Sequence, residues 1–403
     1  MNKRFQKGLA VSALAAMVVA PFAQPVFAIE AGGSGTDLGK AEGADTTLVL
    51  KKDLTVQDLD SDYVPKAPDV SFKYSVTNGE AGKFTSKQED KTEQVYEVKA
   101  GENGDLIKVN NVAKENTINF SGSDTVKSGK VTKDISLDFS DVEKKFTSVG
   151  IYRYVITEGN YTQTDRADLS TALPQTGAGE KTRYIDVYVE EKAGGGFEIK
   201  GYVVSRTDTS EGKESGFTEE KKEDGTTPDS NKSSVYSTYD VTLTKKVAGA
   251  VTNNAGYTFT VTLPTDDTAT YFYQKSGGSE STVSSSSSTT TFTETLKKDE
   301  SFTLKGLPVG TTIGIAETEV QGFKVPTVKI DAGSEEDMTG WAKTGIGYSD
   351  ADADATDVVV TNKKDGSILP PTGILMTIAP FAAMVGLGAA LIALFAKKRK
   401  NEA

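Results

Sequence analysis

Short runs in which apolar and polar residues alternate fill most of the chain between residues 44 and 366. A period of two places successive side chains on opposite faces of a strand, so each run predicts a strand with one buried face. Gly, Asn, Asp and Ser separate the runs, and stretches with helical periodicity are scarce. The clearest runs are residues 70–76, 151–156, 184–189, 257–263, 313–317 and 358–361.

Many short strands of this kind predict an all-β chain built from antiparallel sandwiches. The runs form two similar halves, because each half opens with a strand that carries adjacent lysines and later presents a strand that ends in glutamate. We place the first domain at residues 44–234 and the second at residues 235–366, after a flexible stretch at 29–43. The charged, Gly-containing segment 212–232 predicts a loop near the boundary.

The N-terminus has the organisation of a secretory signal. Three basic residues precede an apolar run at residues 8–22, and Val26-Phe27-Ala28 supplies small residues where a signal peptidase reads. An uncleaved anchor is the alternative, but the run is short and Pro21 and Pro25 interrupt it. We therefore expect residues 1–28 to be removed and the protein to be exported.

The C-terminus combines three features in a fixed order. An apolar span at residues 374–396 is long enough to cross a bilayer, and a basic tail at 397–403 follows it. The pentapeptide that precedes this span is Leu369, Pro370, Pro371, Thr372 and Gly373. This order resembles the cell-wall sorting signal of Gram-positive surface proteins, which a sortase cleaves between Thr and Gly. A plain membrane anchor is the alternative; a second copy of the pentapeptide, at 173–177, has no apolar run behind it.

Composition excludes much of enzyme chemistry. The 403 residues contain no His and no Cys, so His and Cys nucleophiles, His general bases and His or Cys zinc sites are unavailable. The net charge is −12 for the whole chain, and it becomes −18 for residues 29–372, once seven basic residues and Glu402 at the ends are removed. Such an acidic protein repels phosphate backbones, so we expect no nucleic-acid partner.

We expect no cofactor and no metal. Asp350, Asp352 and Asp354 alternate as in calcium loops, but Ala355 replaces the turn glycine and Thr361 stands where the twelfth-position glutamate belongs. The default interpretation is a solvated acidic loop.

Three polar residues of the second half fall on faces that the alternation assigns to the core. Lys245 shares a face with apolar residues of its strand, and Glu317 and Asn362 each follow two apolar residues of the same face. Fraying strand ends with surface ion pairs would be the simpler explanation. Burial, however, shifts lysine toward a neutral amine and glutamate toward a neutral acid. An amine, an acid and an amide together can form a Lys-Asn amide bond with loss of ammonia.

The sequence around these residues resembles the C-terminal domain of streptococcal-type major pilins. The matching segments are Thr242-Leu243-Thr244-Lys245-Lys246-Val247, Gly306-Leu307-Pro308-Val309-Gly310 before Glu317, and Thr361-Asn362-Lys363-Lys364-Asp365. The resemblance implies two tandem immunoglobulin-like (CnaB-type) domains, each with a self-formed Lys-Asn isopeptide bond that an acidic residue promotes. It implies a bond between Lys245 and Asn362 with Glu317 as the catalytic acid.

The first half resembles the family less closely. Glu158 follows an aromatic strand and matches the catalytic glutamate, and Lys52 shares a face with leucines, although a bulge would exchange it for Lys51. Asn231 is the asparagine nearest the domain boundary, so we assign it as the partner of Lys52. If the closing strand instead ran from 235 to 239, Ser237 would occupy the asparagine position and no bond would form.

The resemblance also implies covalent assembly. In the family, a sortase joins the Thr of one subunit to a Lys of the next, near the end of the N-terminal domain. We select Lys222 for this role; Lys213, Lys221 and Lys232 are the alternatives. The expected partners are sortase, further copies of this chain, peptidoglycan, and a host ligand or tip pilin. The rival functions are a monomeric wall-anchored adhesin and a surface hydrolase with paired carboxylates.

Overall fold

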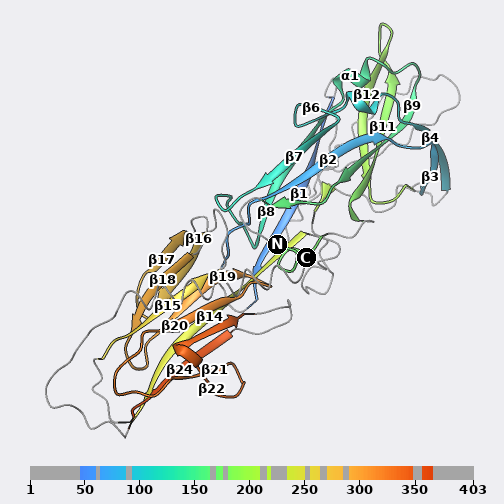
Figure 1. Cartoon of the computed structure of the whole chain (residues 1–403). Coiled ribbons are helices and arrows are strands. Elements are labelled where there is room, and N and C mark those ends of the chain that lie inside the picture. Colours follow the sequence, from blue (N-terminus) through green and yellow to red (C-terminus); the bar gives the residue numbers. More distant parts are fainter. Residues whose placement is uncertain are drawn as a thin grey trace, which may run out of the picture. The chain divides into compact units, whose positions relative to one another are not determined.

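The computed structural model describes residues 46–59, 64–87, 93–163, 169–175, 180–208, 216–218, 234–249, 255–263, 270–284, 290–347 and 356–365. These residues are mostly strand (Figure 1), and their α-helix is the single turn α1 (Ser140–Glu143). The all-β prediction is confirmed, because each of the six clearest runs is a strand. In the described part of the chain no helix is long and apolar enough to cross a membrane. The signal segment and the C-terminal span lie outside the described residues.

Two sheets arise from the part of the chain before residue 218. One contains β1, β8, β5, β6 and β13 and continues through β14 into the later strands as a 12-stranded sheet. The other runs β10-β2-β9-β11-β12, with β7 on β2 and the β3-β4 pair on β9. The strands are β1 (Thr47–Asp58), β2 (Val70–Asn78), β3 (Gly82–Lys87), β4 (Glu93–Ala100), β5 (Lys108–Val109), β6 (Val112–Ala113), β7 (Glu115–Phe120), β8 (Lys130–Asp138), β9 (Gly150–Glu158), β10 (Thr162–Gln163), β11 (Thr182–Glu191), β12 (Phe197–Ser205) and β13 (Gly216–Phe217).

The remaining strands also form two groups. One is β17-β16-β19-β14 with β24, β21 and β22, and the other is β18-β15-β20-β23. Their bounds are β14 (Ser234–Ala248), β15 (Tyr257–Leu263), β16 (Thr270–Lys275), β17 (Glu280–Ser284), β18 (Thr290–Leu296), β19 (Ser301–Pro308), β20 (Ile313–Glu317), β21 (Thr327–Ile330), β22 (Glu336–Asp337), β23 (Ala342–Ile346) and β24 (Thr356–Lys363).

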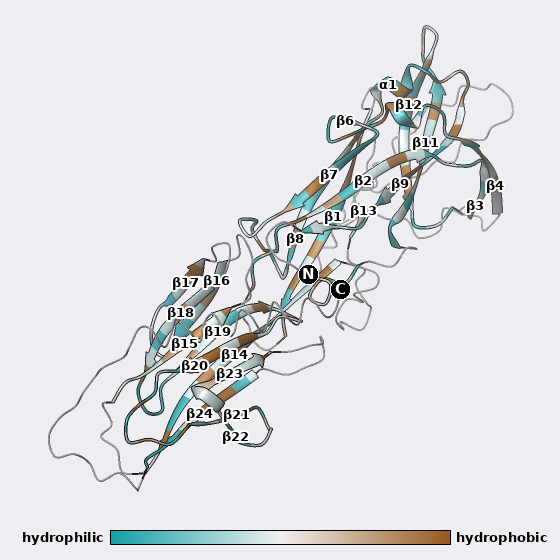
Figure 2. Ribbon diagram, viewed as in Figure 1, coloured by the Kyte–Doolittle hydropathy of each residue, from teal (hydrophilic) through white to brown (hydrophobic). Residues whose placement is uncertain are grey.

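The period-two pattern decides which face of each strand is buried. In β2, Phe72 and Tyr74 are buried whereas Lys73 between them is exposed. Figure 2 shows the same alternation of apolar and polar residues along the strands. Burial of the apolar faces of opposing sheets is the main stabilising contribution. Any polar residue on such a face is consequently enclosed by the core.

Strand β14 takes part in two parallel pairings and one antiparallel pairing. Residues 234–238 run parallel to β1, and residues 241–248 run parallel to β24. An irregularity in its pairing with β19, between Tyr239 and Val241, separates the two stretches. In each case a strand near the start of the proposed domain lies beside a strand near its end. Our proposed domain boundary at 234/235 therefore falls within the first residues of β14.

Candidate functional site

Lys245 lies on the core-facing side of β14. Its neighbours on that face, Leu243 and Val247, are buried, and Lys245 itself has 0% of its surface exposed. The adjacent Lys246 points to the other side, where it pairs with Asp299. Strand periodicity thus buries one lysine of the pair and exposes the other.

Glu317 and Asn362 reach Lys245 from two different strands. Asn362 lies in β24, the parallel neighbour of β14, where it pairs with Val247. Glu317 lies at the end of β20, in the opposing sheet. Lys245 Nζ is 2.9 Å from Glu317 Oε2 and 2.5 Å from Asn362 Oδ1, and Asn362 Nδ2 donates to Glu317 Oε1 at 2.6 Å. The three side chains form a closed, buried hydrogen-bonded ring.

Burial shifts the protonation equilibria of the charged pair. Desolvation lowers the pKa of Lys245 from 10.5 to about 8, against the opposing effect of Glu317. Desolvation likewise raises the pKa of Glu317 above its usual 4.5, although Lys245 and Asn362 oppose that shift. The Lys245 amine also lies 4.6 Å from the centre of the Tyr257 ring. Both shifts favour the neutral amine and the neutral acid, the forms that amide chemistry requires.

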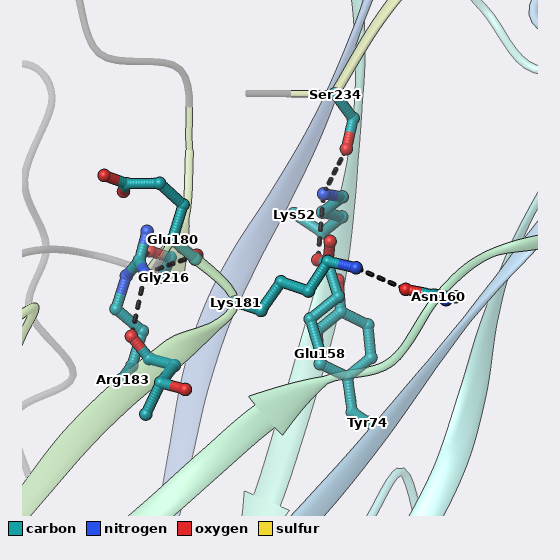
Figure 3. Close-up of polar contacts among 10 residues, drawn as sticks. Lys52, Tyr74, Glu158, Asn160, Glu180, Lys181, Arg183, Gly216 and Ser234 are labelled. Carbon is teal, nitrogen blue, oxygen red and sulfur yellow. Dashed lines mark hydrogen bonds and ion pairs between the residues drawn. The ribbon is translucent and has the colours of Figure 1, made fainter. Parts of the chain in front are cut away.

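A second cluster with the same residue types lies in the first half. Lys52 of β1 and Glu158 of β9 are each 2% exposed, and Lys52 Nζ lies 2.9 Å from Glu158 Oε2. Figure 3 shows Lys52 between Glu158 and Ser234, whose Oγ accepts a 2.7 Å hydrogen bond from the amine. The Tyr74 hydroxyl donates to the same glutamate oxygen at 2.5 Å. Desolvation lowers the pKa of Lys52 and raises that of Tyr74.

The structure brings together five of the residues singled out from the sequence. They fall into two clusters, and their members are Lys245, Glu317, Asn362, Lys52 and Glu158. Lys51, the alternative to Lys52, has an exposed side chain that pairs with Asp134 at 2.6 Å. Ser237 pairs with Gln57, away from Lys52. Asn231, Lys222 and the sorting residues 369–373 lie outside the described residues.

Sequence reasoning missed Ser234 and Tyr74. Ser234 is the first residue of β14, and its register against β1 is a tertiary property. Tyr74 follows the apolar alternation of β2 and therefore gives no separate signal. No group of three or more acidic side chains that could hold a metal ion occurs in the described ranges, and residues 348–355, with the alternating aspartates, are not among them.

One family model matches the second half of the chain. Residues 239–364 match a family described as a domain of unknown function (DUF7601). A protein named Pilin from Streptococcus pyogenes serotype M1 is 34% identical over 111 residues, which are 27% of this chain and 31% of that protein. The chain thus matches about a third of that curated relative's length. This similarity confirms the predicted resemblance to streptococcal pilins.

The matching solved structures include major pilins from Streptococcus pyogenes. The major pilin protein (T3.2) from S. pyogenes serotype GAS13637 is 23% identical, with a TM-score of 0.48 over 80% of this chain and 99% of that chain. Another S. pyogenes major pilin is 17% identical, with a TM-score of 0.46 over 78% of this chain and 98% of that chain.

Proposed function

We propose that the chain is a structural subunit of a covalent surface pilus and that it stabilises itself with an isopeptide bond between Lys245 and Asn362. The buried ring of amine, acid and amide is the observation that supports the bond. The similarity to a pilin and the C-terminal sorting sequence support the assembly into a pilus. Nothing in the acidic composition favours a nucleic-acid or metal-dependent activity.

Glu317 is placed to move the proton that the reaction must transfer. Proton transfer from Lys245 to Glu317 leaves a neutral amine, whose Nζ attacks Cγ of Asn362. The new C–N bond forms, the bond from Cγ to Nδ2 breaks, and the proton held by Glu317 passes to the departing nitrogen. The surplus proton of Nζ then moves to Glu317, which lies within hydrogen-bond distance of it. One ammonia leaves and the ring becomes an amide. Glu317 contacts both nitrogens, the attacking one at 2.9 Å and the departing one at 2.6 Å.

Assembly requires a second bond, made by an enzyme. We propose that a sortase cleaves after Thr372 and transfers that residue to Lys222 of another subunit or, at the base, to peptidoglycan. The internal copy of the motif is a poor substrate by comparison. Its Leu173 is fully buried and accepts a hydrogen bond from the Tyr161 hydroxyl on its carbonyl oxygen.

Mass spectrometry of the full chain, expressed in a host without sortase, tests the self-formed bond. We expect a tryptic branched peptide that joins Lys245 to Asn362, with one ammonia missing. In the Glu317→Ala variant the two peptides should be separate and of full mass. Unbranched peptides from the unaltered, folded chain would refute the proposal.

A further inference from the structure

The two clusters occupy equivalent register positions in their sheets. In the pairing of β14 with β24, Asn362 lies opposite the residue two positions after Lys245. In the pairing of β1 with β14, Ser234 lies opposite the residue two positions after Lys52. Both pairings are parallel, so the lysine and its partner have the same relation in each. Ser234 therefore stands at the position of the reacting amide.

The acids are equivalent as well. Glu317 of β20 pairs with Phe259 of β15, and Glu158 of β9 pairs with Tyr74 of β2. Each glutamate ends its strand on the sheet that faces its lysine, at the same 2.9 Å distance from the amine. The first cluster consequently has a nucleophile and a proton carrier in the arrangement of the second.

Two polar groups near Glu158 provide the hydrogen-bond donor and acceptor that the Asn362 amide provides in the other cluster. Asn362 donates its Nδ2 hydrogen to a glutamate oxygen, whereas in the first cluster the Tyr74 hydroxyl is the donor. Ser234 Oγ takes the place of the amide oxygen as the acceptor for the amine of Lys52. All four side chains are buried and hydrogen-bonded, but Ser234 has no acyl carbon that an amine could attack.

The chain is also interrupted at this place. Phe217 of β13 pairs with Lys52, and Ser234 of β14 pairs with Leu54, so 16 residues of the sequence separate two partners that lie two positions apart along β1. The Gly216 backbone approaches β1 so closely that a Cβ would lie 2.3 Å from a backbone oxygen. In the second half the corresponding strand, β24, is continuous. The partner of β1 beside the cluster therefore consists of two separate segments, β13 and β14.

We infer that the first domain has a crosslinking site in which Ser234 replaces the reacting amide, so that Lys52, Glu158 and Tyr74 hold it by hydrogen bonds alone. The Ser234→Asn substitution is then sufficient to make the site react. Nζ of Lys52 would bond to the new side-chain carbon, the carbon–Nδ2 bond would break, and Glu158 would carry the proton to the departing ammonia. This inference rests on the chemistry of the proposed function.

Peptide mapping by mass spectrometry of the full chain tests the inference. In the unaltered chain we expect one branch, from Lys245, and an unbranched Lys52 peptide. Ser234→Asn should add a second branch, from Lys52 to position 234, with loss of a second ammonia. Ser234→Asn/Glu158→Ala should return to one branch. The matched control is Ser237→Asn, on the same strand but paired with Gln57, which should add no branch.

Three results would overturn the inference. They are a Lys52 branch in the unaltered chain, for example to Asn231; an unbranched Lys52 both in Ser234→Asn and in a folded Tyr74→Phe/Ser234→Asn variant; and a new branch in the control. A different result would separate the two proposals. If Ser234→Asn contains the Lys52 branch but no Lys245 branch, the proposed function is overturned and this inference stands.

A second variant tests whether the Tyr74 hydroxyl leaves too little space for an asparagine at position 234. The larger amide of Ser234→Asn needs the space and the glutamate contact that the Tyr74 hydroxyl now uses. Tyr74→Phe/Ser234→Asn removes that hydroxyl and gives the position the residue type of Phe259. If this double variant folds, by circular dichroism, and Lys52 is still unbranched, the inference is wrong.

Discussion

The charged residues of the two clusters are buried only because each has a partner of opposite charge and a further hydrogen bond. Lys245 contacts Glu317 and Asn362, and Lys52 contacts Glu158 and Ser234. Removing one partner leaves an uncompensated buried charge, which is strongly destabilising. The same desolvation makes the lysine amine more nucleophilic at neutral pH.

The lowered pKa of Lys245 predicts a pH dependence of stability when the bond cannot form. Asn362→Ala keeps the amine of Lys245 free; beside Glu317 in the unaltered chain, burial lowers the pKa of that amine to about 8, against an unfolded-state value of 10.5. The charged lysine therefore penalises the folded state fully below pH 8, and the penalty disappears as the pH rises to 10.5. We expect the free energy of unfolding to increase by roughly 3 kcal/mol over this range.

Urea unfolding at pH 7.5 and pH 10.5 measures this effect. The control is Lys245→Met/Asn362→Ala, which lacks the titrating amine but shares every other group. The predicted quantity is the difference in the free energy of unfolding between the two variants. If that difference is the same at pH 7.5 and pH 10.5, Lys245 does not titrate between these pH values.

Tyr74→Phe tests the hydrogen bond that completes the first cluster. It removes a 2.5 Å donor to a buried carboxylate, so we expect a loss of about 1–3 kcal/mol in the free energy of unfolding. Tyr257→Phe is the matched control, because the buried Tyr257 hydroxyl has no hydrogen-bond partner in the described residues. The urea midpoint of Tyr74→Phe should lie below that of Tyr257→Phe. Equal midpoints would show that the Tyr74 hydroxyl does not contribute to stability.

At the scale of elements, β14 connects the two sites. Ser234 near its start completes the first cluster, and Lys245 near its end begins the second. The proposed bond between Lys245 and Asn362 would link β14 covalently to β24, and it joins residues 117 positions apart. Loop-closure entropy of that size corresponds to about 4–5 kcal/mol if a disulfide estimate applies. Its pairing with β1 depends on noncovalent contacts.

Amide hydrogen exchange should reveal this asymmetry between the pairings. We expect residues 241–248 of β14 and the amides of β24 to exchange more slowly than residues 234–238 and the amides of β1, since the covalent bond prevents separation of the former pair. Mass spectrometry of peptide fragments after deuterium labelling measures the rates.

Asn362→Ser is the control for this experiment. It gives the second cluster the residue found in the first, so exchange in β24 should accelerate while exchange in β1 stays unchanged. Equal protection of the two pairings in the unaltered chain would contradict the prediction.

At the scale of the whole molecule, the proposed assembly depends on the ends of the chain. The part between the ends carries a net charge of −18, which favours solubility and disfavours nonspecific association. A covalent link would hold subunits together against this long-range repulsion. The proposed transfer of Thr372 to a lysine provides that link.

Cell-wall extracts of the native host test this assembly. After boiling in detergent, electrophoresis with an antibody to this chain should show a ladder of high-mass species. Thr372→Ala should abolish the ladder, and Lys222→Arg should reduce it to the monomer. Lys213→Arg is the matched control and should retain the ladder. A single wall-linked band from the unaltered chain would instead support the monomeric adhesin.

The sequence by itself determined the strand content, the buried faces and the buried lysine of the second half. Period-two alternation is a local property, and it places Lys245 beside Leu243 whatever the topology. The missing His and Cys likewise limited the chemistry without reference to a fold. The resemblance to pilins then supplied the pairing of Lys245 with Asn362.

Only the tertiary structure decided what stands beside Lys52. The partner of a strand residue is set by register between segments far apart in the chain, and Lys52 and Ser234 are 182 positions apart. The segment 218–233 hides that register, because distance along the sequence then favours Asn231 over a serine three residues later. A shift of register exchanges the side chain that faces the amine, and with it the chemistry that the site can perform.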